Sequence, residues 1–194
     1  MKSTEDLLPS LDTFVKKSRC YAGIGSRSTP RPILFLIEKI AATLAGGGLI
    51  LRSGAAPGAD TAFETGCDHA HGKKEIFLPW QGFNLHPSPL FSPPEKAEIL
   101  ASLCHPNWRA CSARSQKLHA RNCQQVYGEN LESPVDFVLF WAPEENGVIK
   151  GGTATAVFLA REMKIPSFNL QDKATRERWE RFTDSLGRTL QREP

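Results

Sequence analysis

The sequence has little of what several broad classes of protein require. Lysine and arginine number 24 against 21 aspartates and glutamates, so the formal net charge is only +3. A dedicated nucleic-acid binder typically has a stronger basic excess, although this balance does not exclude one. No apolar run approaches the roughly 18–20 residues of a membrane-spanning helix, so no membrane contact is expected. Residues 1–17 carry acids and no continuous apolar stretch, unlike a signal peptide.

Motifs for metal and redox chemistry are also missing. The five cysteines are an odd number at scattered positions and include no CxxC pair, unlike common disulfide frameworks and zinc sites. The five histidines show no HExxH spacing. We therefore expect reduced thiols in a cytoplasmic protein, and we predict neither a metal nor a cofactor.

The patterns that are present predict an α/β fold. A chain of 194 residues fits one domain, so we expect a single domain over 1–194 with a core at about 19–170. Short apolar runs predict strands at 19–26, 49–52, 75–79, 135–141 and 165–170. Helical spacing of apolar residues predicts helices at 33–45, 59–70, 112–127 and 153–163. This alternation is typical of a Rossmann-like, mainly parallel sheet of about five strands with helices on both faces.

Two further segments lie outside the regular alternation. A proline-rich insertion at about 81–108, with a short helix at 94–104, is typical of a functional loop or lid. A charged C-terminal helix at about 172–188 has Trp179, Phe182 and Leu186 on one face. That face could dock on its own domain or support a homodimer or higher homo-oligomer.

A glycine-rich turn follows the first predicted strand. Residues 23–27 read GIGSR, so Gly25 would let the backbone approach a ligand while Ser26 and Arg27 offer donors to a phosphate or carboxylate. A tight turn with a solvated arginine would explain the same residues. The full GxGxxG fingerprint and its ribose-binding acid are missing, which argues against an ordinary NAD-dependent dehydrogenase.

The second predicted strand leads into another turn of small residues, SGAAPGAD. Its backbone N–H groups could meet an anion at the start of the next helix. The candidate contacts are Ser53, Gly54, Ala55, Gly58 and Asp60. Asp60 could hold a ribose hydroxyl or only cap the helix. Glu64, one helical turn later on the same face, could point into a cleft or into solvent.

A third turn of this kind follows the fourth predicted strand. It brings Gly151, Gly152, Thr153 and Thr155 to the start of a helix. In parallel sheets, ligands bind at the carboxyl ends of the strands beside a switch in strand order. One such turn is readily explained as a purely structural connection, but three of them at the same edge of a sheet are less easily explained in that way. The sequence therefore predicts an anion-binding site at that edge.

Other candidates for the same site are polar or aromatic. Helix 112–127 carries Arg121, Asn122 and Gln125, which would be either donors facing a cleft or part of an exposed polar face. Trp80 and Trp141 each end a strand and could stack on a base, although packing is the commoner role of tryptophan. No order of serine, histidine and aspartate suggests a catalytic triad. The catalytic residues stay unknown, with Glu64 and Asp60 as the candidates.

The three turns together resemble the SLOG superfamily of Rossmann-like proteins, which includes DprA (Smf), the LOG phosphoribohydrolases and YpsA-like proteins. The similarity rests on residues 21–27, 52–60 and 151–156 and covers most of 20–170. The segment LPWQGFN, which adds Asn84 as a candidate contact, resembles a DprA-like subgroup carried by bacteriophages. The resemblance implies a pocket for a nucleotide or its derivative at the glycine-rich turns, and host cytoplasm for a phage-encoded chain.

The resemblance implies different activities for different members. LOG enzymes carry the pattern GGxGTxxE, whose glutamate is needed to split the base–ribose bond, but here Phe158 occupies that position. Phenylalanine cannot act as an acid or a base, which argues against typical LOG catalysis unless Glu64 or Asp60 supplies the carboxylate. DprA proteins bind single-stranded DNA, which needs a positive track that the scattered basic residues do not show in sequence.

Three hypotheses about function follow. The leading one is a protein that binds a nucleotide or nucleotide-derived small molecule, such as an ADP-ribose-like signal, as a sensor or sequestering protein. The first alternative is a DprA-like single-stranded DNA-binding protein in recombination. The second alternative is an N-glycosidic hydrolase of nucleoside monophosphates.

Overall fold

The computed structural model of the chain describes residues 20–190, with side chains described as far as residue 185. Its centre is a five-stranded sheet in the order β3-β2-β1-β4-β7, in which every pair of neighbours is parallel. The strands are β1 (Cys20–Gly25), β2 (Ile50–Ser53), β3 (Lys74–Ile76), β4 (Phe137–Trp141) and β7 (Ser167–Asn169). The predicted α/β fold with a Rossmann-like parallel sheet is confirmed.

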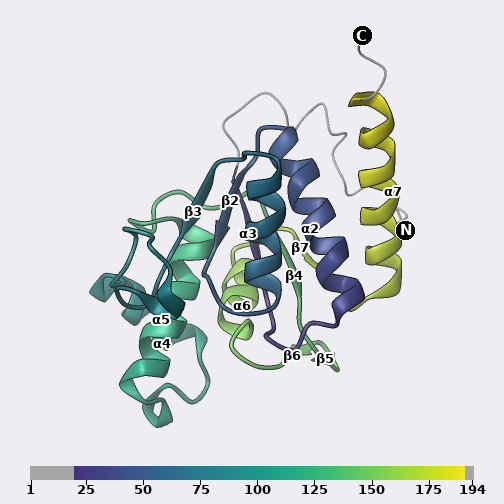
Figure 1. Ribbon diagram of the computed structural model, residues 1–194. Helices are drawn as coiled ribbons and strands as arrows, with labels where there is room; N and C mark the ends of the chain where they lie inside the picture. The colour runs from purple at the N-terminus through teal and green to yellow at the C-terminus, as the bar shows by residue number, and fades with distance from the viewer. Residues whose placement is uncertain (1–19, 191–194) are drawn as a thin grey trace.

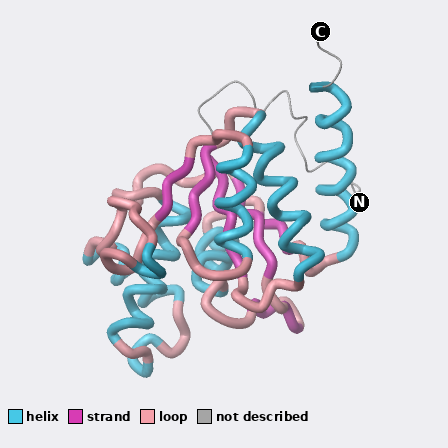
Figure 2. Tube along the Cα trace, in the orientation of Figure 1, coloured by secondary structure: helices cyan, strands magenta, loops and turns pink. Residues whose placement is uncertain are grey.

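Helices cover both faces of the sheet (Figures 1 and 2). One face carries α2 (Arg31–Gly46), α3 (Ala59–His69) and α7 (Lys173–Leu190), and the other carries α4 (Glu95–Cys104), α5 (Ala113–Tyr127) and α6 (Ala154–Glu162). Side chains alternate between the two faces along each strand. Tyr21 and Leu139 therefore pack beneath α2 and α3, while Ala22 and Val138 pack beneath α5 and α6.

The order of the strands creates a switch point between β1 and β4. From β1 the chain adds β2 and then β3 on one side, and it later returns to add β4 and β7 on the other side. Gly25 pairs with Trp141 at the carboxyl ends of the two central strands. Connections leave these two ends in opposite directions, so a crevice opens between them, which is the usual ligand position in such sheets.

Two differences from the predicted elements are local. The strand expected at 75–79 is shorter, because Leu78 leaves the sheet and donates its N–H to the carbonyl of Leu90 at 2.8 Å, and it pairs with Phe91 in an isolated bridge. A small antiparallel hairpin of β5 (Glu144–Glu145) and β6 (Val148–Ile149) was not predicted, because two-residue strands are too short for a periodic signal.

The C-terminal helix α7 packs against its own sheet. The Trp179 ring lies 5.8 Å from the Phe137 ring and 5.9 Å from the Phe168 ring, and the Phe182 ring lies 5.3 Å from that of Trp179. The side chain of Leu186, the third residue of the predicted apolar face, lies outside the described side chains. Within residues 20–190, no helix combines the length and the apolar character that a membrane span requires.

Candidate functional site

A cleft of about 360 Å³ lies at the switch point of the sheet. Four segments line it, namely the turn after β1, the start of α3, one face of α5 and the loop before α6. Nine of the residues predicted from sequence come together there: Gly25, Ser26, Arg27, Asp60, Arg121, Asn122, Gly151, Gly152 and Thr153. The structure therefore brings the first and third turns, and the polar helix, to one place.

Sequence reasoning missed several residues that line the cleft. They are Ile24, Ala56, Ser115, Leu118, His119 and Lys150, whereas Gln125, a candidate donor on the predicted helix, also lines the cleft. Ser115, Leu118, His119 and Asn122 recur at intervals of three or four residues, so they share one face of α5. This helical spacing, with three polar residues among the four, could have indicated that the face lines a cleft. It did not lead to that prediction, because a polar face of a helix usually faces water.

Asp60 and Arg121 form a buried ion pair at the base of the cleft. Arg121 Nη1 donates to Asp60 Oδ2 at 3.2 Å, and only 6% and 4% of the two side chains are exposed. Asp60 Oδ1 accepts the N–H of Gly25 at 3.0 Å. Burial raises the pKa of Asp60, while Arg121 and the Gly25 N–H act in the opposite direction. Both carboxylate oxygens thus already have partners.

The Arg121 guanidinium is seated in a space that only glycine can provide. A Cβ atom at Gly54 would lie 1.2 Å from Arg121 Nη1. With its amide oriented to satisfy its neighbours, Gln125 accepts from the Gly54 N–H at 3.0 Å and from Arg121 Nη1 at 2.9 Å, and it donates to Asn122 Oδ1 at 3.2 Å. Arg121 Nε is buried and has no hydrogen-bond partner among the described residues. A dense polar network therefore fixes the guanidinium beside the cleft.

Positive charge dominates the lining of the cleft. Arg27, Arg121 and Lys150 face it together with a single carboxylate, that of Asp60. Burial lowers the pKa of Arg121, and the nearby charge of Arg27 lowers it further. The Lys150 ammonium is 3.4 Å from the carboxylate of Glu145, in an exposed pair that water screens. The two guanidinium groups are close enough to repel each other, and an anion bound between or beside them would reduce that repulsion.

The start of α6 adds backbone donors to the same cleft. Its first turn, ATAV, has no acidic residue, and within the described residues no side chain caps its N-terminal N–H groups. Gly151 adopts φ +82°, which favours glycine, and a Cβ there or at Gly152 would meet nothing within 4 Å. Asn122 Nδ2 holds this loop by donating to the Gly152 carbonyl at 2.7 Å. The N-terminus of a helix with open N–H groups attracts anions.

The second glycine-rich turn lies beneath the first and supports it. The Ser53 hydroxyl donates to the Gly23 carbonyl at 2.7 Å, and Gly58 has φ +90° with its Cα against the backbone of Ser26. Ala55 packs with Ile76 in a small apolar cluster. The structure therefore places Ser53, Gly54, Ala55 and Gly58 outside the lining of the cleft.

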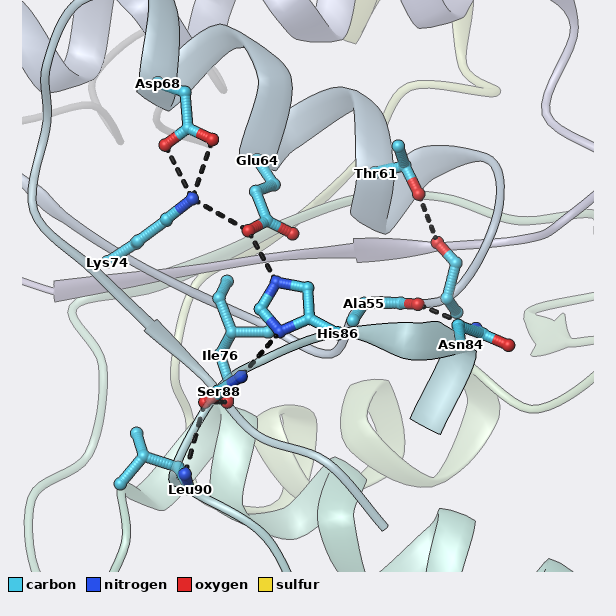
Figure 3. Close-up of polar contacts among 11 residues, drawn as sticks. Ala55, Thr61, Glu64, Asp68, Lys74, Ile76, Asn84, His86, Ser88 and Leu90 are labelled. Carbon is cyan, nitrogen blue, oxygen red and sulfur yellow. Dashed lines mark hydrogen bonds and ion pairs between the residues drawn. The ribbon is translucent and has the colours of Figure 1, made fainter. Parts of the chain in front are cut away.

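Glu64 lies outside the cleft, in a separate polar cluster (Figure 3). Its Oε1 is 2.8 Å from Lys74 Nζ and 2.8 Å from His86 Nε2, and Lys74 also bonds Asp68. In the same region, Asn84 Nδ2 donates to the Ala55 carbonyl at 2.8 Å. These contacts attach the insertion to α3 through Glu64 and to the turn before α3 through Asn84, and neither residue is part of the lining of the cleft.

The remaining predicted contacts also lie outside the lining. The Trp80 ring is 5.1 Å from the Phe83 ring and is covered by the Arg114 guanidinium at 5.0 Å. The Trp141 side chain packs against the apolar core beneath α2 and α3, and its carbonyl accepts the Ser26 N–H at 2.9 Å. Thr155 is buried, and its hydroxyl is 2.8 Å from His119 Nδ1.

A cluster of metal-ligating side chains lies at the edge of the cleft. His105, Cys111 and His119 each offer one ligand atom, and these atoms lie within 4.8 Å of one another. Burial, followed by the neighbouring His105 and Arg121, lowers the pKa of His119 to about 4. The spacing of the three residues matches no zinc signature, and the loop after α4 must fold back onto α5 to bring them together.

Comparison with known proteins shows similarity of fold without similarity of sequence. No family model and no curated protein sequence matches the chain. A molybdenum cofactor carrier protein from Chlamydomonas reinhardtii has 18% identity and a TM-score of 0.50, with 88% of this chain and 85% of that one covered. DprA from Helicobacter pylori, described with a single-stranded DNA binding mode, has 16% identity and a TM-score of 0.55, with 92% and 83% covered.

These similarities define the class of the protein. The chain is a Rossmann-like α/β protein with its cleft at the switch point of a parallel sheet. Its fold is that of the molybdenum cofactor carrier protein and of DprA.

Proposed function

We propose that the cleft binds a phosphate-bearing small molecule, a nucleotide or nucleotide derivative, and that the protein senses or sequesters this ligand. The observation that carries the proposal is the pair of arginines at the switch point. Arg27 and Arg121 both line the cleft, and of these two, among the residues that the structure describes, only Arg121 has an ion-pair partner, in Asp60. An anionic ligand would compensate the second positive charge.

Backbone groups complete a site suited to phosphate. The loop Gly151–Gly152 approaches the cleft without side chains, and it leads into the N-terminus of α6. Two guanidinium groups, one ammonium and one helix N-terminus around about 360 Å³ match the size and polarity of a small phosphate ester. Leu118 and Ile24 provide apolar lining for a less polar part of the ligand.

The positions of the carboxylates favour binding over hydrolysis. A glycosidase mechanism needs a carboxyl group free to reach the scissile bond. Asp60 accepts from Gly25 and Arg121 with its two oxygens, and Glu64 is paired with Lys74 and His86 outside the cleft. The geometry offers neither group as a ready acid, base or nucleophile, so we assign no catalytic role.

The proteins of similar fold are consistent with a ligand at this position. One is a carrier of a small molecule, the molybdenum cofactor, and the other binds single-stranded DNA. A cleft of this volume suits a small molecule, whereas a DNA strand needs an extended positive track. The proposal therefore follows the small-molecule precedent.

Native mass spectrometry of the purified chain, before and after denaturation, tests the proposal. We expect an additional non-covalent mass of nucleotide size that is lost on denaturation and is absent from Arg27→Ala. Fluorescence anisotropy with a labelled oligothymidine strand provides the second arm. Tight, salt-dependent binding of the strand, together with an empty cleft in the mass spectrum, would replace our proposal with DNA binding.

A further inference from the structure

We propose that His105, Cys111 and His119 form a binding site for a divalent transition metal of the zinc class at the edge of the cleft. The three residues come from separate segments. His105 directly follows α4, Cys111 follows the short 3-10 helix η3 (Trp108–Ala110), and His119 lies in the middle of α5. The proposal does not depend on the ligand of the cleft.

The spacing of the ligand atoms fits a tetrahedral metal. Cys111 Sγ lies 3.8 Å from His105 Nδ1, and the ring centroids of His105 and His119 are 4.3 Å apart. Zinc bonds of about 2.3 Å to sulfur and about 2.0–2.1 Å to nitrogen separate two tetrahedral ligands by about 3.6 Å. All three ligand atoms already lie within 4.8 Å of one another. Small side-chain rotations would therefore bring them around one ion.

The hydrogen bonds of the two imidazoles are compatible with metal binding, on His119 through a nitrogen left open and on His105 by replacing one hydrogen bond. His119 Nδ1 is 2.8 Å from the hydroxyl of Thr155, so an N–H donated there leaves Nε2 as the ligand atom. Metal-binding histidines usually have such an outer partner, which fixes the tautomer and the ring orientation. His105 Nδ1 accepts the N–H of Asn107 at 3.2 Å, so this nitrogen carries a lone pair that a metal could take instead.

The chemistry of the ligand set selects the class of metal. Two imidazoles and one thiol suit zinc, cobalt and copper, whereas calcium and magnesium prefer oxygen ligands. The Cys111 sulfur lies 3.6 Å from the Asn107 carbonyl and 3.8 Å from His105 Nδ1, so both contacts are long ones that binding to a metal would replace. Three protein ligands leave a fourth position for water or another small ligand, as in zinc sites that are not purely structural.

Such a metal would connect the second half of the insertion to α5. The side chains of His105 and Cys111 are half-buried, and the Trp108 ring lies 6.5 Å from both imidazole rings. Because a metal that binds only the folded state stabilises it, zinc should raise the melting temperature of the chain. The same ion would have no such effect on a chain that lacks one of the ligands.

Cobalt titration of the chelator-treated chain tests the site directly. We expect one equivalent of Co²⁺ to give the visible bands of tetrahedral cobalt and a near-ultraviolet band from thiolate to cobalt, both removed by one equivalent of Zn²⁺. Cys111→Ser should abolish the thiolate band. His119→Gln should weaken zinc binding by more than ~100-fold, and Thr155→Val by ~10-fold, since outer partners contribute about 10–100-fold.

Cys104→Ser is the matched control, because Cys104 is a half-buried thiol on the adjoining helix and is not part of the cluster. This variant should keep the full cobalt spectrum. The proposal is overturned if wild-type gives no thiolate band, or if Cys111→Ser gives the same spectrum as wild-type. Melting curves without metal establish that each variant folds, and zinc should raise the melting temperature of wild-type and Cys104→Ser but not of Cys111→Ser.

Discussion

Asp60 and Glu64 lie one turn apart on α3, yet the structure gives them different environments. Asp60 is buried at the base of the cleft, where it pairs with Arg121 from α5 and accepts the N–H of Gly25. The Glu64 side chain is 14% exposed and pairs with Lys74 and His86 away from the cleft. From sequence alone, the two carboxylates were equivalent candidates for one face of a helix.

The difference shows that partners from other elements decide what a helical acid does. Four residues advance a helix by about 400°, so the two side chains diverge by about 40°. That angle is small, but it is enough to give the two side chains different partners. Asp60 pairs with Arg121 of α5, whereas Glu64 pairs with Lys74 of β3 and with His86 of the insertion. Substitutions that disrupt one cluster at a time should therefore differ in their cost, with those around Asp60 costing more than those around Glu64.

Asp60→Asn should be the most destabilising of these changes. The amide keeps the size of the side chain but leaves the charge of Arg121 buried without compensation, which typically costs about 3–5 kcal/mol. Urea denaturation of wild-type and variant measures the free energy of unfolding. The double variant Asp60→Asn/Arg121→Met should recover most of the loss, because it removes the unpaired charge as well. A double variant as unstable as the sum of both single variants would contradict this account.

Gly54→Ala should have the next largest effect, through Arg121. The new Cβ would lie 1.2 Å from Nη1, so the guanidinium must leave its seat against Asp60. We expect a loss of about 1–3 kcal/mol, typical of an overpacked interior, and weaker binding of the cleft ligand. Gly46→Ala, where a Cβ would meet nothing within 4 Å, is the matched control and should keep wild-type stability and binding. Equal stability of the two variants would show that the network around Arg121 is not tightly packed.

Glu64→Gln should have the smallest effect. Its partners Lys74 and His86 are partly exposed, so loss of the charge should cost about 1 kcal/mol or less. Ligand binding should be unchanged, because Glu64 does not line the cleft. Calorimetric titration with the ligand found by mass spectrometry measures this. A large fall in affinity for Glu64→Gln would remove the distinction between the two acids.

The sequence predicted the fold well because the fold depends on local periodicity. Short apolar runs indicate buried strands, and apolar residues at helical spacing indicate helices with one buried face. Because these elements alternate along the chain, only a few sheet topologies are compatible with the sequence. The approach of Asp60 and of the turns of Gly25 and Gly151 was likewise predictable, since they follow strands that end at one edge, whereas the orientation of Arg121 on its helix was left open. The second turn was only partly predictable, because Ala56 and Asp60 line the cleft whereas the N–H of Gly54 is bound by Gln125 from a distant helix.

Features that depend on the folding of the insertion could not be predicted. Trp80 ends a strand in sequence, but the chain beyond it turns so that its ring packs against Phe83 and Arg114. The approach of His105 and Cys111 to His119 similarly depends on a loop with no periodic pattern. Long-range pairings of this kind leave no trace in local spacing, so only the structure shows them.

Calorimetric titration of the purified chain with AMP, ADP and ADP-ribose is the decisive measurement for a phosphate site in the cleft. We expect saturable binding of at least one of them to wild-type and to Glu64→Gln, and a loss of that binding in Arg27→Ala. Absence of heat with every one of these nucleotides, or binding that Arg27→Ala leaves unchanged, would contradict a phosphate site at the switch point.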